Sequence, residues 1–140
     1  MANQTPISWK TSVGLNHVGA FQVSGRPFAS GSVAAPVARP VIFPTVTKWV
    51  QVINHGNTPV KVGFSQKGVT STGGGTNYFT VPASGSVSGP GSSPVLDVKI
   101  SQLWISGSTS VDVVAGLTNI DAYKTNTDTG ASWSGSAGVG

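Results

Sequence analysis

The chain has 140 residues, of which 38% are hydrophobic and only 9% are charged. This length fits one domain with a core of its own, and a charged share well below the usual value of about a quarter indicates that another molecule covers part of the surface. Eight scattered bases and four aspartates give a net charge of +4, and the absence of cysteine excludes disulfides, thiolate metal sites and cysteine nucleophiles.

Short runs rich in Val, Ile, Phe, Tyr, Trp and Thr, separated by Gly, Pro, Asn and Ser, predict about eight strands and no long helix. Residues 18–25 and 25–33 are expected to form two short strands around a glycine turn. Prolines bracket residues 38–44, which therefore predict an edge strand or the start of one, because a missing backbone N–H is tolerated there.

The clearest pair of strands lies in residues 48–65, KWVQVINHGNTPVKVGFS. Polar or aromatic residues alternate in both halves with apolar ones that share a face: Val50, Val52, Val60, Val62 and Phe64. The segment NHGNTP between the halves has the composition of a turn. Together these features predict a β-hairpin with one buried face.

Three further strands are expected in the second half of the chain, at residues 77–85, 94–108 and 109–120. The alternation in 94–108 restarts after Ser101, which predicts a bulge or bend there. The polar segment 84–94, SGSVSGPGSSP, is expected to be an exposed loop, with a tip formed by Ser88, Gly89, Pro90 and Gly91.

Both ends of the chain lie outside the strand pattern, so a single domain (1–140) is expected to have a core at about 13–121 and arms at 1–12 and 122–140. Each arm contains one tryptophan, Trp9 or Trp133. A tryptophan in such a segment is typical of an anchor that docks on its own domain or on a neighbour. The aromatic residues on expected strands are assigned to the core: Phe21, Phe28, Phe43, Phe64, Phe79, Trp49 and Trp104.

Groups that could carry chemistry are few. His17 and His55 both lie next to asparagine in loop-like sequence, and His55 is expected to be a solvated residue of the hairpin turn. Asp97 and Asp112 would face each other only if their strands pair, and the simpler expectation is two solvent-facing residues. No catalytic residue, cofactor site or metal site is therefore predicted, and the chain is not expected to be an enzyme.

Five stretches carry a resemblance to a known family: VGAFQVSGRPFASG, WVQVINHGNTPVKVGFS, NYFTVPASGS, LDVKISQLWISG and VDVVAGLTNI. In strand order, strand length and Gly/Ser/Thr-rich, cysteine-free texture they resemble the small single jelly-roll structural proteins of virus particles. These are the minor capsid, penton-type and decoration proteins of large DNA viruses and tailed phages. The resemblance covers residues 13–120 and implies an eight-stranded antiparallel sandwich, symmetric assembly, arms that reach neighbours, and no catalysis.

The resemblance leads us to expect a virion structural protein, a capsid subunit made in the host cytoplasm. It would form a homo-oligomer and contact other capsid proteins through flat sandwich faces and its arms. No membrane insertion is expected, since no stretch approaches the length that spans a bilayer, and the N-terminus lacks the pattern of a signal peptide. The scattered bases argue against a nucleic-acid partner, which clustered bases would indicate.

Three alternatives stay open. The fold could be a seven-stranded immunoglobulin-like sandwich. The chain could be a carbohydrate- or receptor-binding sandwich module, of a viral fibre or a secreted protein, with a glycan as its partner. It could also be a hydrolase on a β-sandwich, which would need converging His, Asp and Ser side chains. Surface positions for Trp49 and Trp104 would favour sugar binding, and buried positions would favour the structural role.

Overall fold

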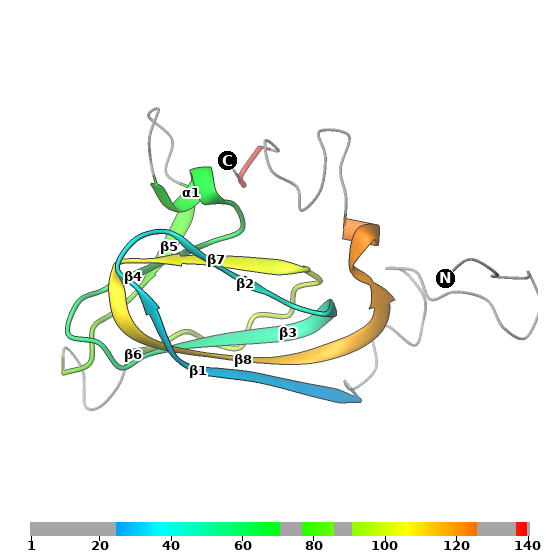
Figure 1. The fold of residues 1–140 in the computed structure, drawn as a ribbon, viewed down its shortest axis with the longest axis horizontal. Coiled ribbons are helices and arrows are strands. Elements are labelled where there is room, and N and C mark those ends of the chain that lie inside the picture. Colours follow the sequence, from blue (N-terminus) through cyan, green and yellow to red (C-terminus); the bar gives the residue numbers. More distant parts are fainter. Residues whose placement is uncertain (1–24, 71–76, 86–90, 126–136, 140) are drawn as a thin grey trace, which may run out of the picture.

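A computed structural model describes residues 25–70, 77–85, 91–125 and 137–139. In these residues the chain forms two four-stranded antiparallel sheets that lie face to face (Figure 1). In spatial order, the first sheet contains β1 (Arg26–Ala35), β8 (Ser108–Asp121), β3 (Thr45–Asn54) and β6 (Gly91–Ser92), and the second sheet contains β2 (Arg39–Ile42), β7 (Gln102–Ser106), β4 (Val60–Gly63) and β5 (Tyr78–Val81). Helical structure in this part of the chain is confined to α1 (Gln66–Thr70) and the 3₁₀ turn η2 (Ala122–Thr125). The expectation of an all-β sandwich is confirmed.

The strand pairs are nested along the chain. β1 pairs with β8, β2 with β7, β3 with β6, and β4 with β5, all antiparallel. The additional pairs β3–β8 and β4–β7 complete the two sheets. Successive pairs alternate between the sheets: β1–β8 and β3–β6 belong to the first sheet, and β2–β7 and β4–β5 belong to the second.

The core between the sheets follows from the alternation of apolar residues along the strands. Val50 and Val52 on β3 and Val111 and Val113 on β8 have no exposed surface, whereas their neighbours in the chain are partly exposed. A strand directs successive side chains to opposite faces, so each such run supplies one wall of the core. The second sheet supplies the other wall, with buried side chains at Val41, Val60, Val62, Val81, Leu103 and Ile105.

The predicted hairpin at residues 48–65 is wrong. Its two strands, β3 and β4, lie in different sheets, and the segment NHGNTP is a corner at which the chain crosses from one sheet to the other. Asn54 holds this corner, because its side-chain amide donates to the Thr58 carbonyl (2.8 Å) and its side-chain oxygen accepts the Gly56 N–H (2.9 Å). One buried face per strand fits a hairpin and a sandwich corner equally well, so the alternation could not decide between them.

The predicted strand at 94–108 is only partly correct. Residues 102–106 form β7, but residues 94–101 run beside β3 with a single bridge, between Val50 and Leu96. The restart of the pattern near Ser101 is the point at which the chain passes from the first sheet to the second. By contrast, residues 109–120 lie within β8, and the proline-bracketed segment at 38–44 contains β2, at an edge of the second sheet, as predicted.

The expectations for the aromatic residues are met in part. Phe43 is buried, and Phe28, Phe64 and Phe79 pack against the core while partly exposed. Trp49 and Trp104 do not belong to the core. Trp104 lies between the buried Leu103 and Ile105, and Trp49 precedes the buried Val50, so Trp49 lies on the outer face of the first sheet and Trp104 on that of the second.

Some of the positions named in the sequence analysis lie outside the described residues. They are Trp9, Trp133, Ser88, Gly89, Pro90, Phe21 and His17. Gly91, expected at an exposed loop tip, is instead buried in β6 and pairs with Asn54. In the part of the chain that the structure describes, no helix is long and apolar enough to cross a membrane.

Candidate functional site

A polar cluster lies at one end of the first sheet, where β8 passes the corner after β3. One carboxylate oxygen of Asp112, Oδ2, lies 2.8 Å from Nε2 of His55. The other, Oδ1, accepts a hydrogen bond from the backbone N–H of Ser32, also at 2.8 Å. The side chains of His55 and Asp112 are 43% and 32% exposed. His55 therefore has a carboxylate partner, which the sequence analysis missed when it assigned this residue to a solvated turn.

The cluster joins three segments that are distant in the chain. Ser32 lies at an irregularity in the β1–β8 pairing and has a φ of 54°, which is unusual for a residue with a side chain. Asp112 accepts the N–H that this local distortion turns away from the ladder. Asp97, by contrast, lies on the segment beside β3 and its segment does not pair with β8. Among the described residues, no three His, Cys, Asp or Glu side chains gather into a group that could hold a metal ion.

Replacing Ser32 with glycine is expected to raise the free energy of unfolding by about 0.5 to 1 kcal/mol, because glycine adopts a positive φ without the steric cost of a Cβ. The measurement is the midpoint of urea unfolding. Ser30→Gly is the matched control on the same strand, and it is expected to lower stability by a similar amount because Ser30 has no positive φ. Equal losses for both variants would contradict the role assigned to the Ser32 backbone.

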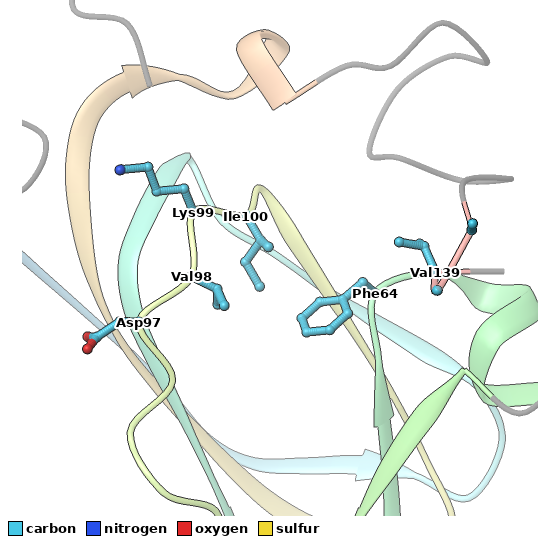
Figure 2. Close-up of a pocket in the computed structure, with 8 residues that line it drawn as sticks. Phe64, Asp97, Val98, Lys99, Ile100 and Val139 are labelled. Atoms are coloured by element: carbon cyan, nitrogen blue, oxygen red, sulfur yellow. The ribbon is translucent and has the colours of Figure 1, made fainter. Parts of the chain in front are cut away.

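A second candidate is a pocket of about 490 Å³ between Phe64, the segment 97–100 and residues 137–139. Figure 2 shows the side chains of Phe64, Val98 and Ile100 pointing into the hollow, whereas Asp97 and Lys99 point away from it. This alternation leaves a mainly apolar lining. The pocket contains neither His55 nor Asp112, so it does not bring the polar cluster to a cavity.

A smaller pocket of about 310 Å³ lies on the other side of residues 137–139 and shares Phe64 and Gly138 with the first. Its remaining lining comes from β4, β5 and the residue before β5: Val62, Asn77, Tyr78 and Phe79. Gly138 and Phe64 therefore border both hollows. The Ser65 hydroxyl holds the segment 137–139 by donating to the Val139 carbonyl at 2.7 Å.

The third candidate is the outer face of the first sheet. Register places residues of the outer face in rows across β1, β8 and β3: Ala29, Val114 and Gln51 in one row, and Pro27, the buried Gly116 and Trp49 in the next. A third row pairs Ile53 with Asp112, the only charged residue of the three rows. Since the exposed face of an antiparallel sheet is normally polar, a face with so few charged residues is unusual for a surface in contact with water.

The outer face of the second sheet is partly covered. Trp104 pairs with Pro40 on one side and with Gly63 on the other. The helix α1 packs against β4 and β7, and Val69 of this helix lies so close to Gly63 that a Cβ there would be 2.9 Å from its side chain. Trp104 is thus shielded by local structure, and its indole Nε1 is buried with no hydrogen-bond partner.

Comparisons with known proteins give no match to a family model, a curated protein or a solved structure. What the chain does is therefore inferred from its geometry. Of the three candidates, the polar cluster joins Asp112 to the Ser32 backbone and to His55, the two pockets both border Gly138, and the outer face of the first sheet carries exposed and partly exposed residues with one charge in three rows.

Proposed function

We propose that the chain is a structural subunit of a virus particle, a capsid protein of minor, penton or decoration type with a single jelly-roll fold. Its localisation would then be the virion, after synthesis in the host cytoplasm. The observation that carries the proposal is the outer face of the first sheet, which has a single charged residue, Asp112, in the three rows that also contain Pro27, Ala29, Trp49, Gln51, Ile53, Val114 and Gly116. This face would pack against identical subunits or other capsid proteins.

The nested strand pairing supports the jelly-roll assignment. A jelly roll has eight strands in two sheets with Greek-key connections. Pairing the first strand with the last, the second with the seventh, and so on inward gives the spatial orders β1-β8-β3-β6 and β2-β7-β4-β5. An immunoglobulin-like constant domain has seven strands, divided four and three between its sheets, and so fits the two four-stranded sheets less well.

The size of the face also bears on the proposal. Along β3 the face runs from Trp49 to Ile53. With strands about 4.8 Å apart and a rise of about 3.3 Å per residue, its three strands cover roughly 14 by 17 Å, or about 240 Å². A stable interface of standard size buries about 800 Å² on each partner. The face would thus supply about a third of such an interface, and other parts of the chain would have to contribute the rest.

The test is the mass of the full chain in solution, by light scattering after size exclusion, with and without the substitution Val114→Lys. Val114 lies at the centre of the face, between Ala29 and Gln51. The unchanged chain is expected to form a closed oligomer. Val114→Lys is expected to be monomeric, because assembly would bury an unpaired ammonium group at a cost of several kcal/mol.

The matched control is Thr80→Lys, which adds the same charge at an exposed position of β5 in the other sheet. It is expected to leave the oligomer intact, and far-UV circular dichroism should match for all three proteins. An unchanged chain that is monomeric at every concentration would contradict the proposal, as would an oligomer that survives Val114→Lys. A monomer would favour the carbohydrate-binding alternative, for which the partly exposed position of Trp49 on the outer face of the first sheet is the favouring observation.

A further inference from the structure

The backbone of Val139 lies in a seat formed by the turn before α1 and by α1 itself. Ser65, which is 2% exposed, donates its hydroxyl hydrogen to the Val139 carbonyl at 2.7 Å and accepts the Gly68 N–H at 3.0 Å. Gly68 is buried, and a Cβ at this position would lie 2.6 Å from the same carbonyl oxygen. The Val139 carbonyl thus accepts a hydrogen bond from a buried donor and occupies space that is free because residue 68 is a glycine. Contacts of this kind recognise an extended segment through its backbone.

The groove around Ser65 and Gly68 leaves free space beside the segment that occupies it. Two hollows, of about 490 Å³ and about 310 Å³, both border Gly138. The occupant has small side chains, with Ala137 and Gly138 exposed and Gly138 at a φ of 84°. The contact is therefore made mainly through backbone, and the same contacts would form with this segment from any copy of the chain.

The connection between Thr125 and Ala137 contains more residues than are needed to join these two positions. Thr125, 1% exposed, is fixed by a hydrogen bond between its hydroxyl and that of Ser101 (2.8 Å), and the neighbouring Ile100 lines the larger pocket together with Ala137. The connection thus begins at a residue held next to the pocket lining and ends at Ala137, which lines the pocket. The connection contains eleven residues, 126–136, which reach up to about 40 Å when extended, far more than crossing one pocket needs.

We propose that the groove around Ser65 and Gly68 receives residues 137–139 of a second copy of the chain, in a reciprocal exchange of C-terminal segments. Exchange gives up no contact, because the groove offers the same donor and the same space to either segment. The exchange also buries surface between the two chains, and so contributes to the interface area that the outer face of the first sheet does not supply alone. The inference rests on the proposed function, since it requires an assembly of identical chains.

The test places a photoreactive benzoylphenylalanine in place of Ala137, in the full chain. Ala137 is exposed and lines the larger pocket, so the added ring would lie beside Phe64 and the segment 97–100. After irradiation, a denaturing gel separates cross-links within one chain from cross-links between chains. The expected result is covalent dimers whose cross-linked peptides contain Phe64 or residues 97–100.

Gly68→Ala, combined with the same photoreactive residue, is expected to abolish these dimers, because its methyl group would occupy the seat of the Val139 carbonyl. Gly25→Ala is the matched control, since a Cβ at Gly25 meets nothing within 4 Å, and it should leave the dimers unchanged. Ser65→Ala, which adds no atom to the groove, should weaken the same cross-link and serves as the second groove variant if Gly68→Ala fails to fold.

The outcomes separate the two proposals when the mass of the unchanged chain is measured at the same concentration. An oligomer whose cross-links all stay within one chain would overturn the exchange and leave the structural role standing. A monomer whose cross-links stay within one chain would overturn both. Cross-links between chains that map away from Phe64 and residues 97–100 would also overturn the exchange, because the segment would then dock elsewhere.

Discussion

Asn54→Ala is expected to lower the free energy of unfolding by about 3 to 5 kcal/mol, a large part of the stability of a domain of this size. Asn54 is fully buried, and its side-chain oxygen accepts the Ser108 hydroxyl (2.7 Å) and the Gly56 N–H (2.9 Å). Its amide group donates to the carbonyls of Thr58 (2.8 Å) and Pro82 (3.2 Å). The alanine variant would leave buried donors and acceptors without partners, and each such group costs about 1 to 3 kcal/mol. Urea unfolding with an unchanged m-value measures the loss.

The matched control is Asn57→Ala, three residues further along the same corner, where the asparagine is exposed. It is expected to change stability by less than about 0.5 kcal/mol. A loss below about 1 kcal/mol for Asn54→Ala would show that the corner does not depend on this side chain. Ser108→Ala should cost less than Asn54→Ala, and the double variant should cost less than both added together, since the two side chains share a hydrogen bond.

Among glycine-to-alanine substitutions in the described part of the chain, Gly91→Ala is expected to be the most destabilising. It should lower the free energy of unfolding by about 3 kcal/mol or more. A Cβ at Gly91 would overlap the carbonyl oxygen of Pro82 and lie 2.7 Å from its carbonyl carbon. Both atoms belong to the backbone after β5, so neither can swing away as a side chain would. Relief would require β6 to move from β3, which breaks the pairing of Gly91 with Asn54. Thermal unfolding measures the effect as a large fall in Tm.

Gly25→Ala provides the comparison for this prediction, because it makes the same chemical change at a glycine with open space around it. It is expected to leave Tm unchanged or slightly higher. If Gly91→Ala unfolded at the same temperature as Gly25→Ala, the close approach of β6 to the residues after β5 would be wrong. The same experiment therefore tests the placement of the shortest strand, which has only two residues.

The alternation of apolar and polar residues predicted those features of the strands that depend only on residues within the same strand. In the strand expected at 109–120, Val111 and Val113 alternate in the sequence with Asp112 and Val114, and the structure has the two former buried and the two latter partly exposed. The edge position of β2 was predicted from its prolines, for the same reason: a missing N–H acts within the strand that contains it. Both features are visible in a window of a few residues.

Partners distant in the chain could not be predicted in this way. The N–H of Ser32 and the carboxylate of Asp112 are 80 residues apart in sequence, and His55 is 57 residues from the same carboxylate. Nor does one buried face per strand tell which sheet the strand joins, which is why the corner at Asn54 was predicted as a hairpin turn. Trp49 shows a related limit: alternation placed it opposite Val50, but the general preference of aromatic residues for the core was followed instead.

The central place of the last strand in the first sheet has a consequence for the order of events during synthesis. β8 is the last of the described strands, yet it lies between β1 and β3 and pairs with both. Until it leaves the ribosome, β1 lacks the strand with which it pairs in the described part of the chain, and one wall of the core is incomplete. Folding must then close loops of many tens of residues at once, which makes it slow for a domain of this size. A nascent chain therefore exposes unpaired strand edges until β8 has been made, and this is the interval in which it depends most on chaperones.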